Sequence, residues 1–306
     1  MRKKHIFGIV KEDSMKAKIA NRANGANRAI SVYLLLVLGV CYLLGLLEII
    51  TNTGRFYQIL GVSFTFIPVI AAIITRRITD ERAKFHLSLR VWKNIRYWVL
   101  SAFLPGILIA AGTAVYYLLF PEQYSGIFQI GVRLGTDMEI AVKSPVLFAL
   151  VCIIISAVMI PMHLLELGEE IGWRGYLLGF QTEKYGEKKA VLINGTEWGL
   201  AHLPLIYFGF NYSMENPGAP WSNMGMMMIM CIVLGIFLSY VTIKTENCMY
   251  AAIIHGAVNV IGELPVYLSI NLKSGLLGPN PTGILTMLPL IAAAIPCFMK
   301  LRDKIR

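Results

Sequence analysis

The sequence predicts an all-α, polytopic membrane protein of about eight transmembrane helices in one bundle, with both termini in the cytoplasm. Of its 306 residues, 56% are hydrophobic and only 15% are charged, whereas soluble domains carry about 25% charged residues. The apolar residues form long runs, and the basic residues gather between alternate runs. This composition excludes a disordered chain, a secreted disulfide scaffold and almost any soluble enzyme.

Runs of about 20 apolar residues, the length that crosses the hydrocarbon core of a bilayer, follow one another along the chain. We expect a single helical membrane domain over 29–306, preceded by a basic cytoplasmic arm at 1–28. The more polar segment 166–189 keeps helical spacing, which predicts a helix partly at the membrane interface. The predicted spans are 29–50, 57–75, 97–120, 145–165, 190–210, 223–243, 248–270 and 282–299.

The distribution of basic residues predicts the orientation of these spans. On the side of the N-terminus the eight-span arrangement places 24 Lys and Arg residues, and on the other side 4. Cytoplasmic loops carry such an excess of positive charge, so the termini are expected in the cytoplasm. The net charge is +10, but the basic arm has no interleaved aromatic residues. It therefore favours membrane lipids as partners and not nucleic acid.

Three polar groups fall where lipid is expected. An ionisable side chain at membrane depth costs about 2.5–3.5 kcal/mol on insertion scales, so each is a candidate functional residue. From the predicted span starts, His202 lies roughly 18 Å and His255 roughly 12 Å along the helix axis from the cytoplasmic end. The groups can thus converge in a cavity open to the cytoplasm. The candidates are Glu169, Glu170, Arg174, His202, His255 and Asn259.

These residue types favour the activation of water, although simpler interpretations remain. In a pair of adjacent glutamates, crowding turns one into a general base while an arginine keeps the other ionised. Imidazoles position the water, and an amide stabilises an oxyanion. Glu169, His202 and His255 can alternatively hold zinc with a water. The simpler interpretation is an exposed acidic cluster with a local Glu170–Arg174 ion pair, beside histidines that only pack between helices.

The three motifs together resemble those of the CAAX protease and bacteriocin-processing (CPBP) family of intramembrane endopeptidases. The first and last match the family's pattern fully: Glu169-Glu170-Ile-Gly-Trp-Arg174 and His255-Gly-Ala-Val-Asn259. In the middle motif, Trp198-Gly-Leu-Ala-His202, tryptophan stands where the family has phenylalanine. The resemblance implies a catalytic core at about 145–271.

By this resemblance, Glu169 is the general base, Glu170 supports it and Arg174 orients the pair. His202 and His255 position the water, and Asn259 helps to stabilise the oxyanion. The cofactor is zinc, or none is needed.

The family implies an endopeptidase of the bacterial plasma membrane, like the CAAX prenyl proteases, with its active site open toward the cytoplasm. Its substrate is a peptide or protein at the membrane, lipidated or bacteriocin-like. The alternative is a catalytically silent bacteriocin-immunity or membrane scaffolding protein of the same fold. A secondary transporter is a third class, but the internal repeats expected of one are missing from the sequence. Glu166, Glu197 and Glu263 receive no role.

Overall fold

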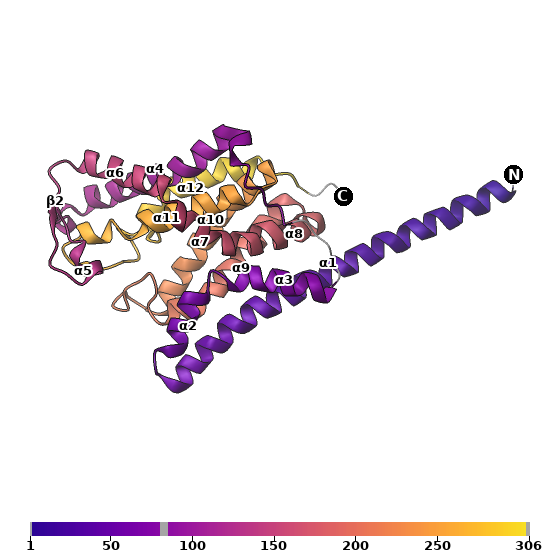
Figure 1. Ribbon diagram of the computed structural model, residues 1–306, viewed down its shortest axis with the longest axis horizontal. Coiled ribbons are helices and arrows are strands. Elements are labelled where there is room, and N and C mark those ends of the chain that lie inside the picture. Colours follow the sequence, from indigo (N-terminus) through magenta and orange to yellow (C-terminus); the bar gives the residue numbers. More distant parts are fainter. Residues whose placement is uncertain (1, 80–84, 304–306) are drawn as a thin grey trace.

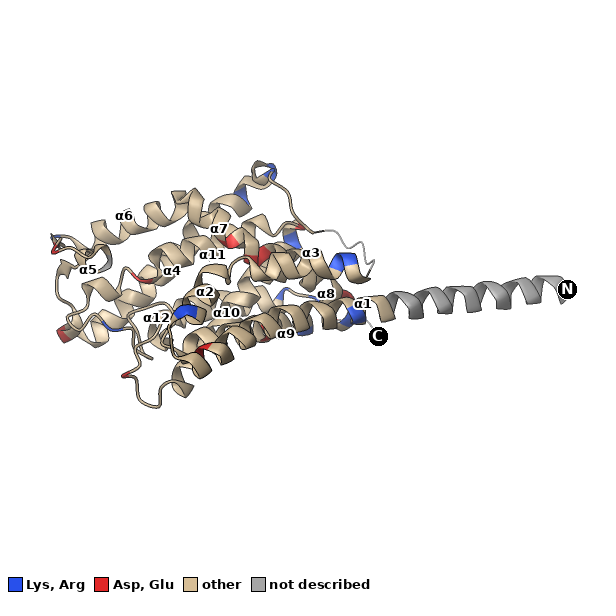
Figure 2. Cartoon of the chain, turned by 60° about the horizontal axis from the view of Figure 1, so that its bottom comes forward, with Lys and Arg blue, Asp and Glu red and all other residues tan. Residues whose placement is uncertain are grey.

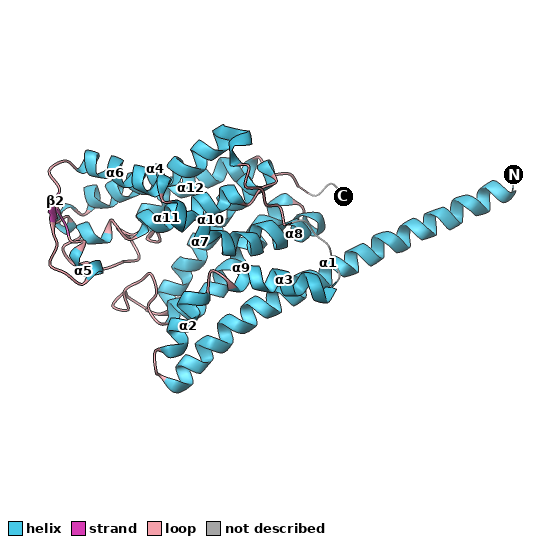
Figure 3. Ribbon diagram, viewed as in Figure 1, coloured by secondary structure: helices cyan, strands magenta, loops and turns pink. Residues whose placement is uncertain are grey.

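The computed structural model describes residues 2–79 and 85–303, with side chains from residue 24 onward except that of residue 133. The all-α prediction is confirmed, because most of the described chain is helical and its strands are very short (Figure 3). The strands β1 (Ile127–Phe128) and β2 (Ile140–Ala141) form a small antiparallel pair around α5 (Gly131–Leu134). This pair lies between the helices Ile95–Leu119 and Pro145–Val158, in a segment where no strand was predicted.

Each of the eight predicted spans coincides with a helix or a bent pair of helices. Among the described residues, four helical segments have the length and composition to cross a membrane, and the number rises to six if each of two bent pairs is one span. The expected count of eight is therefore not confirmed. The helices are α1 (Arg2–Thr51), α2 (Arg55–Ser63), α3 (Ile67–Thr79), α4 (Ile95–Leu119), α6 (Pro145–Val158), α7 (Ile160–Glu170), α8 (Leu178–Tyr185), α9 (Glu187–Tyr207), α10 (Trp221–Thr245), α11 (Met249–Gly262) and α12 (Ile284–Met299).

Two predicted spans lack a clear membrane-crossing signal for different reasons. Helix α12 has only 16 residues, and α9 carries Asn194, Glu197 and His202 along its length. Short 3₁₀ turns adjoin other helices at Val91–Asn94, Pro121–Gln123 and Val266–Leu268.

The basic cytoplasmic arm at 1–28 stays a prediction. Helix α1 runs through it, and most of its side chains lie outside the described residues.

Prolines account for the two bends. Helices α2 and α3 meet at 70°, and α6 meets the following helix at 57°. Pro68 and Pro161 have no backbone N–H, so each removes a helical hydrogen bond to the residue four positions earlier, at the break. The bent α6–α7 pair brings the acidic motif back into the bundle.

The helices form two flanks around a central group. Helices α4, α6 and α12 lie on one flank and α1, α2 and α3 on the other, with α7, α9, α10 and α11 between them (Figure 1). Glycines allow the central helices close approach. A Cβ at Gly256 of α11 would lie 2.7 Å from the His163 Cα of α7, and one at Gly195 of α9 would lie 2.9 Å from the Ile232 Cα of α10. This close packing positions the three motifs.

Candidate active site

The central helices bring five of the six predicted residues into one buried cluster. Glu169 and Glu170 end α7, and Arg174 follows on a π-helical turn, Ile171–Leu177. His202 comes from α9 and His255 from α11. All five side chains are at most 6% exposed. The simpler interpretation of an exposed acidic cluster is therefore wrong, since residues 166–181 are mostly buried in the helical bundle. The position of segment 166–189 at the membrane interface stays a prediction.

Glu170 connects the arginine to a histidine. Its Oε1 accepts hydrogen bonds from Arg174 Nη1 at 3.1 Å and His255 Nδ1 at 3.0 Å. An ionised carboxylate can only accept, so the proton at this contact sits on Nδ1 of His255. The bond fixes the orientation of the imidazole, which leaves Nε2 facing the other carboxylates.

Glu166 is a member of the cluster that sequence reasoning left without a role. Its Oε2 lies 3.7 Å from His255 Nε2. One ligand atom from each of Glu166, Glu169 and His255 lies within 4.8 Å of the other two. The predicted metal set of Glu169, His202 and His255 stays a prediction, and the structure adds Glu166 as a further candidate ligand beside Glu169 and His255. The stripe of Glu166, Glu170 and Arg174 at four-residue spacing was the signal available in the sequence.

Trp198 does more than replace a phenylalanine. Its indole Nε1 donates a 2.8 Å hydrogen bond to Glu169 Oε2. Its ring lies edge-on to His202 and His255, with centroids 5.4 and 5.2 Å away. The guanidinium carbon of Arg174 lies 4.2 Å from its centroid, within cation–π range. Trp198 thus contacts Arg174 and both histidines of the cluster, and it holds one oxygen of Glu169.

His202 is oriented by its own helix. Its Nδ1 lies 2.9 Å from the Trp198 carbonyl oxygen, so Nδ1 carries the proton and Nε2 is left as an acceptor. The ring packs on Phe64 at 4.4 Å. These contacts leave one nitrogen available to a water or a substrate.

Asn259 stands apart from the cluster. It is exposed, one turn beyond His255 on α11, and its side chain makes no hydrogen bond within the described part of the chain. Its role as an oxyanion donor stays a prediction.

Glu197, which received no role from the sequence, accepts a 2.6 Å hydrogen bond from Gln181. The Gln181 side chain in turn accepts a hydrogen bond from Asn194. Glu197 and Gln181 lie outside the cluster.

The cluster contains more acidic than basic side chains among the described residues. Glu166, Glu169 and Glu170 face one guanidinium, that of Arg174, and the shared histidine His255. Figure 2 shows acidic residues next to α7 and α11 inside the bundle. Buried charges need compensation, which protons or a divalent cation can supply here. Two carboxylates and an imidazole nitrogen are a donor set that zinc accepts.

Comparison with known proteins agrees with this geometry. Residues 142–261 match the family described as "Type II CAAX prenyl endopeptidase Rce1-like". A curated CAAX prenyl protease 2 from Methanococcus maripaludis is 31% identical over 99 residues, which cover 31% of this chain and 36% of that protein. The chain thus aligns with about a third of that relative's length. Residues 142–261, which contain the whole cluster, are thus similar to the Rce1-like endopeptidases, in line with the motif resemblance to the CPBP family.

Proposed function

We propose that this protein is an intramembrane endopeptidase of the CAAX protease type, which hydrolyses peptide bonds of membrane-associated substrates. The observation that carries the proposal is the environment of Glu169. One of its oxygens is held by Trp198, and the other makes no hydrogen bond to a described residue. Glu170 is less suited as a base because a single oxygen already accepts from Arg174 and His255.

In the proposed reaction, Glu169 takes a proton from a water molecule, and the water oxygen attacks the carbonyl carbon of the scissile bond. His202, with Nε2 free to accept, orients the water from α9. His255, held by Glu170, faces the same space from α11. Asn259 donates to the oxyanion of the tetrahedral intermediate. Glu169 then passes its proton to the leaving nitrogen, and the C–N bond breaks.

The same residues could also bind a metal ion. Glu166, Glu169 and His255 would hold a zinc ion, which when bound supplies a Lewis acid and a more acidic water. The Glu170–His255 hydrogen bond is the kind of contact that orients metal-ligating histidines. Either form of the site uses the same buried cluster.

The proposed substrate is a peptide or protein segment in or at the membrane, lipidated or bacteriocin-like. We place the protein in the bacterial plasma membrane with the site open toward the cytoplasm, on the distribution of basic residues. The name of the curated relative favours a CAAX-type substrate.

The test compares cleavage of membrane-anchored peptides by reconstituted wild type and Glu169→Gln. The matched control is Glu215→Gln, because Glu215 is an exposed carboxylate that pairs with Lys273 outside the cluster. We expect cleavage by wild type and the control, and none by Glu169→Gln. If Glu169→Gln cleaves as well as wild type, Glu169 is not the base. If a cellular immunity phenotype persists in Glu169→Gln, the protein acts as the silent scaffolding alternative.

A further inference from the structure

A cavity lies apart from the catalytic cluster, between α4, α6 and the end of α11. Its volume is about 380 Å³, within the range of ligand pockets. The floor is buried and apolar, with Ile109, Cys152 and Ile261. At its mouth Leu118 of α4 is 80% exposed, and Pro145 of α6 is exposed as well. In a membrane-spanning chain such apolar side chains face hydrocarbon, so the cavity opens sideways toward lipid.

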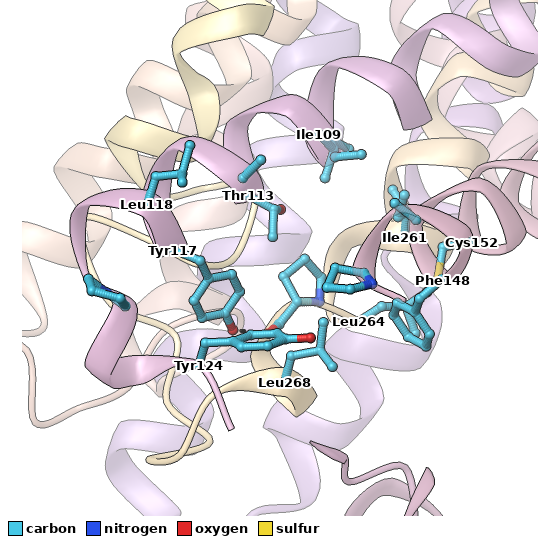
Figure 4. A pocket seen from close by; sticks show the side chains of 16 residues that line it. Ile109, Thr113, Tyr117, Leu118, Tyr124, Phe148, Cys152, Ile261, Leu264 and Leu268 are labelled. Atoms are coloured by element: carbon cyan, nitrogen blue, oxygen red, sulfur yellow. Dashed lines mark hydrogen bonds between the residues drawn. The ribbon is translucent and has the colours of Figure 1, made fainter. Parts of the chain in front are cut away.

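Two hydroxyl groups interrupt the apolar wall. Tyr124 Oη and Thr113 Oγ1 are both buried without a hydrogen-bond partner among the described residues. The neighbouring Tyr117 differs, since its hydroxyl donates to the Pro265 carbonyl oxygen at 2.6 Å. Figure 4 shows the Tyr124 hydroxyl directed into the pocket. Buried polar groups almost always have a partner. Two unpaired donors in an apolar cavity therefore suit a ligand that combines a hydrocarbon chain with acceptor oxygens.

We infer that this cavity binds one acyl chain of a membrane glycerophospholipid, whose ester carbonyl accepts hydrogen bonds from Tyr124 and Thr113. An ester carbonyl accepts but does not donate, which complements two hydroxyl donors. Tyr124 also stacks edge-on with Tyr117 at 5.2 Å. Tyrosines gather at the boundary between hydrocarbon and head groups, where lipid esters lie.

The position of the cavity favours a bilayer lipid over the lipid tail of a substrate. Ile261, in the cavity wall, follows His255 by six residues on α11. Six residues correspond to about 9 Å along the axis and about 120° around the helix. The cavity and the catalytic histidine therefore lie on different faces of α11. Lipid binding here does not depend on the proposed hydrolysis.

The test is a lipid titration of the delipidated full-length protein, followed by native mass spectrometry. The probes are palmitoyl-oleoyl phosphatidylglycerol and its dialkyl ether analogue, which lacks the carbonyls. We expect wild type to bind one diester lipid tightly and the ether analogue about 10-fold more weakly, the size of one or two hydrogen bonds. The double variant Thr113→Val/Tyr124→Phe should bind the diester about 10-fold more weakly. The control Tyr116→Phe, beside the cavity wall, should bind as wild type does.

A cavity-filling variant, Ala114→Phe, should lose the tight site altogether. Equal affinity in wild type and Ala114→Phe would place the lipid elsewhere and overturn the inference. So would one-for-one displacement of the lipid by a prenylated cysteine peptide, which would assign the cavity to a substrate tail. If Ala114→Phe does not fold, the comparison of ester with ether on wild type decides, and equal binding rejects the inference. Glu169→Gln should bind lipid normally, which separates this result from any failure of the catalytic proposal.

Discussion

Replacement of Arg174 by methionine should destabilise the protein strongly. The guanidinium is fully buried, 3.1 Å from Glu170 and stacked on Trp198. Methionine fills a similar apolar volume but leaves the carboxylates of the cluster with His255 as their one basic partner among the described residues. Two unit charges at 3.1 Å attract by about 5 kcal/mol at an effective dielectric constant of about 20. Because one partner remains buried, we expect the free energy of unfolding to fall by about 3–5 kcal/mol.

The matched control is Lys188→Met. This change breaks the Lys188–Asp303 pair, whose side chains are 31% and 74% exposed, so it should cost at most about 1 kcal/mol.

The loss of hydration offsets part of the attraction between Arg174 and Glu170. Three of their buried polar atoms have no partner among the described residues: Arg174 Nε, Arg174 Nη2 and Glu170 Oε2. The double variant Arg174→Met/Glu170→Gln should therefore recover much of the stability lost by the single change.

The free energy of unfolding can be measured by titration with sodium dodecyl sulfate in mixed micelles. The two single variants should differ by at least about 2 kcal/mol, the difference between the buried and exposed estimates. Equal stability of Arg174→Met and Lys188→Met would refute the argument that the buried cluster depends on the arginine.

Three further changes test separate parts of the site. Trp198→Phe keeps an aromatic ring but removes the N–H that donates to Glu169. This change should lower kcat about 10–100-fold with little change in KM. If the steady-state kinetics are unchanged, Trp198 has no positioning role. Gly256→Ala forces a Cβ against the backbone of His163, so unfolding titrations should show a loss of about 1–3 kcal/mol, and none if the helices can separate freely. Asn259→Ala should slow turnover about 10²–10³-fold, and an unaltered rate would exclude it as an oxyanion donor.

The sequence alone predicted the positions of the helices and most residues of the buried cluster. Apolar runs identified each described helix or bent pair that has the length and composition to cross a membrane, because hydrocarbon demands long apolar segments with internally paired backbones. The four-residue spacing also predicted that Glu170 and Arg174 share a helix face, as their 3.1 Å contact confirms. Polar residues at membrane depth pointed to His202 and His255, and both are in the cluster.

The contacts between helices could not be predicted in the same way. Spacing fixes which face of a helix a residue occupies, but not how that face turns toward a neighbouring helix. The contact of Glu166 with His255, the bond from Trp198 to Glu169 and the exposure of Asn259 all depend on this rotation. The π-helical turn that carries Arg174 likewise has no periodic signal of its own.

The central claim, that the Glu169 cluster uses water to cleave a peptide bond, is tested most directly by isotope incorporation. Reconstituted protein is incubated with a membrane-anchored peptide library in ¹⁸O-labelled water, and the metal content of the same sample is determined. We predict new C-terminal carboxylates that carry one ¹⁸O atom in wild type, and no such products in Glu169→Gln. Products without ¹⁸O, or labelled products from Glu169→Gln at the wild-type rate, would contradict the account.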